Sequence, residues 1–244
     1  MVLGAWSVHK YFMEVVLGKR EASTLSSIIS PRFEYLIMRP KEHGLFVQLM
    51  DRSKSIITEH FLEKSLFKSY TATGEYAFFA IPNTKLEIRG MSALRLTTRG
   101  AVMRMVWTSE EFSFERSIYL LDQDYVSIPF TPRRTLALPI ALFSRILRLA
   151  ERTLEVDVEE SGATISSVPE KNRITVTSTV GVAPGDPCTF NLLKYHLDRL
   201  PRIQAYSTLA LDLDANGVVR MTLEGLGVLT SISMSSEVVF FNEH

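Results

Sequence analysis

The stretch GLFVQLMDRSKSIITEHFLEKSLFKSY, residues 44–70, decides the fold, because it predicts a hairpin of two strands. Apolar residues alternate in residues 44–50 and again in residues 55–61, which is the period of half-buried strands. A polar knot, residues 50–55 (MDRSKS), separates the two runs, and a short segment with aromatic residues follows them. No pattern in the stretch is typical of a catalytic site, so its function has to be inferred together with the rest of the chain.

Most of the remaining sequence also consists of short β-branched or aromatic runs bounded by turn residues, and it therefore predicts strands. Asn216-Gly217 lies between two such runs and is a strong signal for a two-residue hairpin turn. The further predicted strands are residues 9–17, 32–38, 75–81, 93–98, 101–107 and 112–121 in the first half, and residues 154–159, 163–168, 173–180, 207–214, 218–224 and 228–234 in the second.

Four helices are predicted, at corresponding places in the two halves of the chain. Residues 18–30 and 138–153 come early in each half, and residues 82–90 and 188–200 come later. The proline-containing segment between the halves predicts an extended connector. We therefore expect an α+β protein of two structurally similar domains of antiparallel sheet: an N-terminal domain over residues 1–121, an interdomain connector over 122–137 and a C-terminal domain over 138–244.

The composition is that of a soluble globular protein and argues against several classes. The chain has 244 residues, and its 27 basic and 27 acidic side chains cancel, so a protein that simply coats nucleic acid is not expected. The single cysteine, Cys188, excludes an internal disulfide and suits a reducing compartment. No apolar run is long enough for a membrane span, and the N-terminus does not have the pattern of a secretory signal.

No motif predicts catalysis, a metal site or a cofactor. The five histidines are scattered and lack cysteine or carboxylate neighbours at metal-ligand spacing, so surface or core histidines are the better interpretation. No nucleophile elbow, phosphate-binding loop or dinucleotide fingerprint follows a predicted strand. We therefore expect a protein that is not an enzyme. An enzyme whose polar pocket the sequence does not advertise is the third hypothesis.

The predicted helices carry cations on one face. In residues 138–153, Arg148 and Arg152 fall at about 300° and about 340° from Arg145, so the three share the face opposite the apolar stripe. An ordinary solvated face usually mixes both signs of charge, and some acids do intrude here. Four helices biased toward Lys and Arg in a neutral chain favour a positive surface that binds phosphates without reading bases. The predicted DNA-contacting residues are Lys19, Arg20, Lys85, Arg89, Arg145, Arg148, Arg152, Lys194 and Arg199.

The stretch 44–70 resembles the first hairpin of eukaryotic and archaeal DNA sliding clamps, with its Met-Asp-Ser-Ser-like knot and following Phe-x-x-Tyr segment. YLLDQDYVSIPF (119–130) resembles the last strand of the clamp's first domain and the start of its connector. LPIALFSRILRLAER (138–152) resembles the basic helix that opens the second domain, and residues 190–234 resemble the closing helix and three-strand meander. The resemblance extends over residues 9–236, nearly the whole chain.

This resemblance implies a subunit of a trimeric ring of the proliferating cell nuclear antigen (PCNA) type, whose inner helices surround double-stranded DNA. The implied partners are duplex DNA, bound without sequence preference, other clamp subunits, a clamp loader and peptide motifs of repair or replication proteins, and the implied location is the nucleus. The neutral charge and the serine-basic-serine knot favour a subunit of the heterotrimeric nine-one-one DNA-damage checkpoint clamp. A homotrimeric replicative clamp is the alternative.

The resemblance also implies a partner-binding pocket on the outer face of the ring. Its residues are Met50 and Lys54 of the knot and Ile128, Pro129 and Phe130 of the connector. Ile128 and Phe130 equally fit the interpretation of linker residues packed on the core. The strands predicted in residues 112–121 and 173–180 would pair with neighbouring subunits.

The C-terminal domain is shorter than in the clamps between residues 167 and 188, and this difference leaves ring closure open. A second hypothesis follows from it: a clamp-fold interaction scaffold that no longer encircles DNA.

Overall fold

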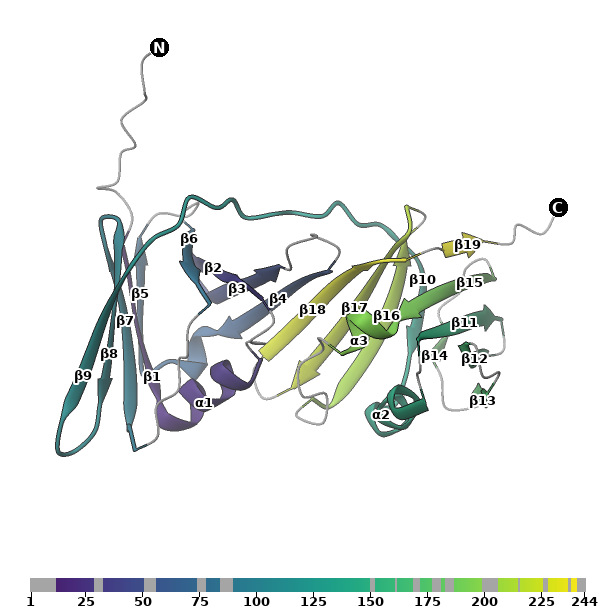
Figure 1. Ribbon diagram of the computed structural model, residues 1–244, viewed down its shortest axis with the longest axis horizontal. Coiled ribbons are helices and arrows are strands. Elements are labelled where there is room, and N and C mark those ends of the chain that lie inside the picture. The colour runs from purple at the N-terminus through teal and green to yellow at the C-terminus, as the bar shows by residue number, and fades with distance from the viewer. Residues whose placement is uncertain are drawn as a thin grey trace, which may run out of the picture. The chain divides into compact units, whose positions relative to one another are not determined.

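The chain folds into β-sheets with few helices, and the two halves repeat a succession of nine strands with a helix after the first of them (Figure 1). The computed structural model describes residues 12–28, 33–50, 56–73, 78–83, 90–149, 152–160, 162–168, 172–176, 181–182, 187–198, 206–214, 216–225, 228–236 and 238–240. Every strand pair whose register is known is antiparallel, as the sequence predicts.

The first half contains nine strands, one α-helix and one short 3-10 helix within the described residues. They are β1 (Phe12–Gly18), α1 (Lys19–Ile28), β2 (Tyr35–Lys41), β3 (Gly44–Met50), β4 (Ile56–Glu63), η1 (Lys64–Leu66), β5 (Ser69–Thr73), β6 (Phe79–Pro82), β7 (Ala93–Arg99), β8 (Val102–Thr108) and β9 (Ser113–Tyr119).

The second half follows an extended segment and has ten strands and two α-helices within the described residues. They are β10 (Pro132–Ala137), α2 (Ile140–Leu149), β11 (Thr153–Glu159), β12 (Gly162–Val168), β13 (Asn172–Val176), β14 (Gly181–Val182), β15 (Cys188–Leu193), α3 (Lys194–Leu197), β16 (Thr208–Asp214), β17 (Val218–Gly225), β18 (Val228–Ser235) and β19 (Val238–Phe240).

The two halves repeat one sheet topology. The strand order β5-β1-β7-β8-β9 of the first half has its counterpart in the order β14-β10-β16-β17-β18 of the second. The order β4-β3-β2-β6 likewise has its counterpart in β13-β12-β11-β15, to which β19 is added. Each strand of the first half thus has an equivalent nine places later in the chain, and α1 and α2 each follow the first strand of their half. The prediction of two similar domains is confirmed.

Contacts divide the chain into two compact units. Unit 1 comprises Met1–Leu49 and His60–Val126, and unit 2 comprises Met50–Glu59 and Ser127–His244. The short segment Met50–Glu59, which includes the first four residues of β4, therefore belongs to the unit that holds the second half, and β4 follows β18 in the strand order. The predicted domain limits at residues 121 and 138 stay a prediction. Of the predicted connector, residues 122–131 are extended, and the rest forms β10.

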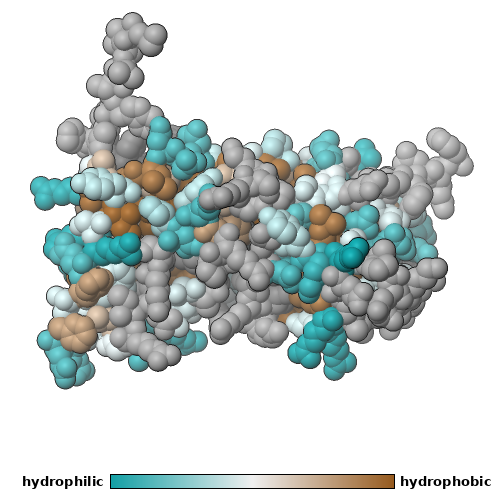
Figure 2. All heavy atoms as spheres, viewed as in Figure 1, coloured by the Kyte–Doolittle hydropathy of each residue, from teal (hydrophilic) through white to brown (hydrophobic). Residues whose placement is uncertain are grey.

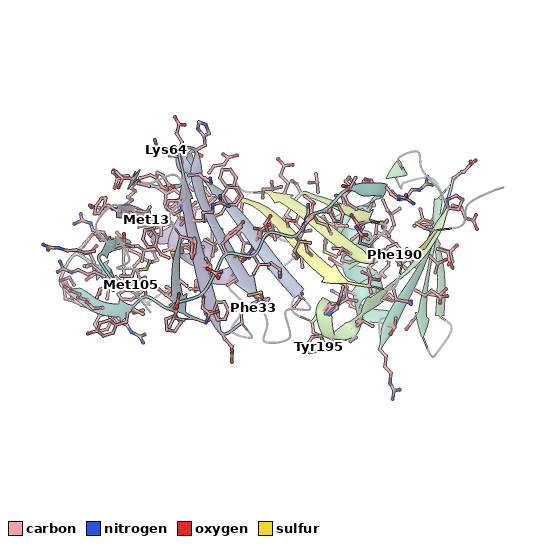
Figure 3. The ribbon with its side chains drawn as sticks, turned by 90° about the horizontal axis from the view of Figure 1, so that it is seen from above. Met13, Phe33, Lys64, Met105, Phe190 and Tyr195 are labelled. Carbon is pink, nitrogen blue, oxygen red and sulfur yellow. The ribbon has the colours of Figure 1, made fainter. Side chains whose placement is uncertain are left out.

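Alternation of buried and exposed residues explains the sheets. In unit 1, Met13, Leu96 and Met105 are fully buried on one face of neighbouring strands, and α1 packs on β1 and β7. In unit 2, Phe190 of β15 and Met221 of β17 are fully buried in the same way. Figure 3 shows Met13, Met105 and Phe190 among the strands that carry them. Burial of such side chains is the main favourable contribution to folding.

The opening stretch contains two residues that fix the β2–β3 turn. A Cβ atom at Gly44 would collide with the Leu62 carbonyl oxygen and with the Phe61 ring, so no larger residue fits there. The Tyr70 hydroxyl donates a hydrogen bond to the Lys41 carbonyl oxygen at 2.8 Å and also accepts one from the Lys41 N–H at 3.1 Å. The predicted Phe-x-x-Tyr segment therefore has a structural role in unit 1.

One predicted element is wrong, and several were not predicted. Residues 188–200 were expected to form a helix, but residues 188–193 form β15 and only Lys194–Leu197 form a helical turn. Cys188, Phe190 and Leu192 are buried and alternate with the more exposed Thr189 and Asn191, which is the period of a strand. Strands β5, β10, β14 and β19 were not predicted. The helix expected at residues 82–90 lies mostly outside the described residues, although Pro82 ends β6.

No helix among the described residues has both the length and the apolar character needed to cross a membrane.

Candidate nucleic-acid surface, connector and edge strand

The helix α1 exposes the two predicted cations at its beginning. Lys19 and Arg20 are exposed, whereas Ala22 and Leu25 are buried toward the sheet. The N-terminus of a helix carries a partial positive charge, so cations in the first turn are electrostatically unfavourable there. Only Glu21 in this turn has the favourable sign. The pair therefore does not serve helix stability, which is consistent with a role in binding anions.

The helix α2 separates its apolar and cationic faces as the sequence predicts. Phe143 and Ile146, one turn apart, are almost fully buried, while Arg145 and Arg148 are exposed. The buried stripe is rotated relative to the prediction, since Ile146 is more buried than Leu147 and Ile140. Both guanidinium groups still lie away from the stripe. Arg148 in the last turn also interacts favourably with the helix dipole.

Arg152 is not on the α2 face, and this part of the prediction is wrong. The described part of α2 ends at Leu149, and Arg152 directly precedes β11. Its side chain is exposed, and its carbonyl oxygen accepts a hydrogen bond from the Lys194 N–H at 2.8 Å. The backbones of Arg152 and Lys194 are therefore neighbours, which requires that Arg152 is not part of a helix.

Lys194 begins α3 and not the middle of a long helix. Its ammonium group lies 3.1 Å from the Asp198 carboxylate, and both side chains are partly exposed. Its neighbours Leu193 and Tyr195 expose 41% and 48% of their surface. The Tyr195 ring makes an edge contact with the ring of the buried His196 at 5.5 Å between centroids. Figure 3 shows Tyr195 beside the α3 ribbon.

Four of the predicted site residues lie outside the described residues: Lys54, Lys85, Arg89 and Arg199. Their roles stay predictions.

The first part of the connector is fixed to unit 1 by a side chain that sequence reasoning missed. The amide nitrogen of Gln48 donates to the Val126 carbonyl oxygen at 2.7 Å, and the Val126 N–H donates to the Gln48 amide oxygen at 2.9 Å. Gln48 is buried on β3, and its side-chain amide makes with Val126 the two hydrogen bonds that a residue of a neighbouring strand would otherwise make. The Arg39 guanidinium lies over the ring of Tyr125, 4.9 Å from its centroid.

The second part of the connector is fixed to unit 2 by Arg220 of β17. Its guanidinium lies 4.0 Å from the centroid of the Phe130 ring, and one of its nitrogens donates to the Ile128 carbonyl oxygen at 3.4 Å. The side-chain nitrogen Nε also donates to the Ser233 hydroxyl at 3.3 Å. Such a stacked, multiply bonded guanidinium holds its partner more firmly than a flexible lysine.

Asp214 fixes the end of the connector. Its carboxylate accepts a hydrogen bond from the Thr131 N–H at 2.8 Å. Burial opposes ionisation of this carboxyl group, but hydrogen bonds from Thr131 and Asn216 and the charge of Arg220 more than offset burial, so the pKa of Asp214 is lowered. Only Ser127, which is exposed, lies between the residues fixed to unit 1 and those fixed to unit 2.

These contacts bear on the predicted partner-binding pocket. Met50 is only 2% exposed, so in this conformation it offers almost no surface to a partner. Ile128 and Phe130 are half-buried, and Pro129 is exposed. The two half-buried residues are engaged by Arg220, and the structure brings them together with that residue. Arg220, Gln48 and Asp214 were missed because each contact joins residues 78 to 92 positions apart, with no local sequence signal.

Strand β9 is the open edge of the first-half sheet. Within the described residues it pairs with β8 alone, and all of its residues except Ile118 are exposed. Figure 2 shows hydrophobic side chains at the surface near the end of the β8–β9 hairpin. The exposed large hydrophobic residues on and beside the strand are Phe112, Phe114, Tyr119 and Leu121.

The backbone of β9 presents a free row of hydrogen-bonding groups. The Leu120 N–H donates to the Ala101 carbonyl oxygen, and the Ser109 N–H donates to the Phe112 carbonyl oxygen, so the even-numbered residues of β9 face β8. The outward N–H and C=O groups are therefore those of Ser113, Glu115, Ser117 and Tyr119. The row ends at Leu121, whose N–H donates to the Ala80 carbonyl oxygen at 2.7 Å.

The described residues do not assemble a metal site or an obvious catalytic group. No cluster of three or more His, Cys, Asp or Glu side chains there is arranged to hold a metal ion. Cys188 is a buried free thiol. His60 is fully buried, and burial lowers its pKa to about 3, so the imidazole is neutral at physiological pH.

Comparisons with known proteins identify the fold. No family model matches the sequence, and no curated protein does. The structure is similar to the crystal structure of proliferating cellular nuclear antigen from Entamoeba histolytica, with a TM-score of 0.69 and 12% sequence identity. The similarity covers 93% of this chain and 99% of that chain. The chain thus has the PCNA-like sliding-clamp fold of two similar domains, and the resemblance inferred from the hairpin is confirmed at the level of the fold.

Proposed function

We propose that this clamp-fold chain is a subunit of a trimeric DNA sliding clamp, in which its β9 edge pairs with a neighbouring subunit. The observation that carries the proposal is the internal repeat of the sheet topology. In the strand order, β18 is followed by β4, whose residues 56–59 belong to unit 2. By the repeat, β9 is the equivalent of β18, and β13 is the equivalent of β4. The joint that β18 and β4 form within one chain is therefore available between β9 of one subunit and β13 of the next.

Such a head-to-tail joint is heterologous, and it closes into a ring when the rotation per joint is right. The exposed aromatic residues along β9 supply the apolar contact that strand pairing alone lacks. An open, long and partly hydrophobic edge is otherwise an aggregation hazard, which also favours a partner that covers it.

In this ring the cations of α1 and α2 contact DNA phosphates. Four of these, Lys19, Arg20, Arg145 and Arg148, are exposed helical residues. Phosphate contacts give affinity without sequence preference, which suits a ring that slides. A clamp of this kind acts as a binding platform and not as an enzyme.

The neutral net charge and the serine-basic-serine knot support a heterotrimeric checkpoint clamp of the nine-one-one type over a replicative homotrimer. A loader that opens the ring, peptide motifs of repair or signalling proteins that dock near the connector, and a nuclear location are parts of the same proposal.

A charge-reversal experiment tests the DNA surface. The Arg145→Glu/Arg148→Glu variant is expected to bind duplex DNA at least tenfold more weakly at low salt, with a smaller salt dependence, because two phosphate contacts become repulsive. The matched control is Arg95→Glu/Arg99→Glu, which changes the charge by the same amount on exposed positions of β7. Duplex affinity is measured by fluorescence anisotropy over a series of salt concentrations, with circular dichroism as the test of folding.

Equal loss of affinity in both variants would show that only net charge matters and would contradict the assignment. Unchanged affinity in a folded Arg145→Glu/Arg148→Glu variant would also contradict it.

A further inference from the structure

The surface around α3 differs in chemistry from the other cationic surfaces of the molecule. Leu193 and Tyr195, which flank Lys194 in the sequence, are both exposed where β15 is followed by α3. On α2, by contrast, the exposed cations have no exposed aromatic residue beside them, since Phe143 is 1% exposed. A surface for sliding on duplex DNA needs cations alone, so the aromatic residue at α3 requires a separate explanation.

Two basic residues are close to this aromatic residue along the backbone. Lys194 directly precedes Tyr195, and the Lys194 N–H donates to the Arg152 carbonyl oxygen, so the backbone of Arg152 lies beside that of Lys194. The Asp198 carboxylate pairs with the Lys194 ammonium group, and the Arg152 side chain is exposed. The Tyr195 ring is oriented by its edge contact with the buried His196 ring, so its position is fixed from one side.

We propose that Tyr195, together with Arg152 and Lys194, binds an unpaired base of DNA, so that the clamp prefers duplexes with a single-stranded gap. The cations hold the phosphates on either side, and the tyrosine ring stacks on the base. Combining a cationic groove with an exposed aromatic ring is the usual way in which proteins bind single-stranded nucleic acid. A base in an intact duplex is already stacked on both faces, and therefore gains nothing from the ring.

This inference rests on the proposed function, because it assumes that the cationic surface of unit 2 meets DNA. It adds a substrate class to that function. Phosphate contacts alone do not distinguish gapped from intact duplexes, whereas stacking on a free base does.

The test compares a fluorescent duplex with the same duplex carrying a short gap, both bound by the full chain at one salt concentration. The wild-type chain is expected to bind the gapped DNA about fivefold more tightly or better, which is the lower end for one stacked base. Tyr195→Ala is expected to abolish this preference without changing duplex affinity. Tyr195→Phe keeps the ring and should retain the preference, and Tyr195→Leu keeps apolar area without a π-face and should lose it. Because nearly half of the tyrosine is exposed, these variants are expected to fold.

Equal affinity of the wild type for both DNAs, or a preference that survives in Tyr195→Ala, would overturn the inference while leaving the sliding clamp intact. Loss of binding to both DNAs in Arg145→Glu/Arg148→Glu, with loss of only the gap preference in Tyr195→Ala, would support both proposals separately. A wild-type chain that binds neither DNA at low salt would overturn both.

Discussion

Strands β9 and β18 occupy the same place in the two halves of the chain, yet one is open and the other is covered. Each is the last strand in its order, β5-β1-β7-β8-β9 or β14-β10-β16-β17-β18. Six of the seven residues of β9 are exposed, whereas five of the eight residues of β18 are buried. The difference does not come from the preceding strand, since both pair along their full length with β8 or β17.

The difference comes from the other side of the strand. In the strand order β18 is followed by β4, whereas β9 has no further strand beside it within the described residues. Of these two equivalent strands, β18 therefore has a strand on both sides, and β9 is an edge strand of the part of the chain that the structure describes. The surface most directly linked to assembly is therefore the backbone edge of β9, and exposed apolar side chains on and beside this strand surround it.

The largest expected effect comes from placing proline on the outward side of each strand. Ser117 of β9 and Ser231 of β18 both have N–H groups that point away from the preceding strand, by the alternation that the Leu120–Ala101 and Ser236–Gly217 hydrogen bonds establish. Ser231→Pro is expected to destabilise the chain by about 3 kcal/mol, the upper end of the cost of leaving a buried backbone carbonyl without its hydrogen bond. Ser117→Pro is expected to leave the stability of the isolated chain nearly unchanged, because edge strands tolerate proline.

Urea denaturation of both variants measures the two effects. Equal destabilisation would mean that β9 is not an open edge in solution.

An intermediate effect is expected from pH, and it concerns the strand that follows β18. His60 of β4 has a pKa of about 3 in the folded chain, against an ordinary value of 6.5. Between these values the unfolded chain binds a proton that the folded chain does not, so stability falls as pH decreases below 6.5. Lowering the pH from 7 to 5 is expected to reduce the free energy of unfolding by about 2 kcal/mol through this residue.

The measurement is urea denaturation at several pH values for the wild type and for His60→Gln. The variant is expected to lose most of the pH slope, whatever its stability at pH 7. An unchanged slope would show that other groups cause the acid sensitivity.

The smallest effect on the isolated chain is expected from exposed side chains on the two strands. Tyr119, the last residue of β9, is 79% exposed, and Leu229 of β18 is 42% exposed. Replacing either with serine is expected to change stability by less than about 0.5 kcal/mol, because neither lies in the core. Only Tyr119→Ser is expected to weaken subunit assembly, by about tenfold or more, since aromatic residues at interface centres contribute strongly to binding. Equal effects of both substitutions on assembly, measured by sedimentation, would contradict the comparison.

Much of the fold was predictable because period and turn chemistry act locally. The apolar run of residues 44–50 and the basic, amphipathic residues 140–149 identify a strand and a helix directly, although β3 is buried at six of its seven residues and not on one face only. The Asn216-Gly217 hairpin is confirmed, with Gly217 at a φ of 78°, a conformation that glycine adopts without strain.

Other parts depend on tertiary contacts. Residues 188–193 have the period of a strand inside a segment that the sequence predicts as a helix, and pairing with β11 decides for the strand. The Gln48–Val126 and Arg220–Phe130 contacts join distant segments, and no local pattern announces them. The site residues on α1 and α2 could be predicted as exposed cations. The hydrogen bond between Lys194 and Arg152 could not be predicted, because the sequence places both residues inside helices, at 138–153 and 188–200.

The central claim, that β9 pairs with another clamp subunit, is tested most directly by the mass of the assembly in solution. The wild-type chain and Ser117→Pro are each measured by light scattering, alone and mixed with the other clamp-fold chains of the same organism. The account predicts a three-chain mass for the wild type with its partner subunits and a loss of that mass for Ser117→Pro. A wild-type chain that keeps the mass of a single chain in every mixture, or a Ser117→Pro variant that assembles as the wild type does, would contradict it.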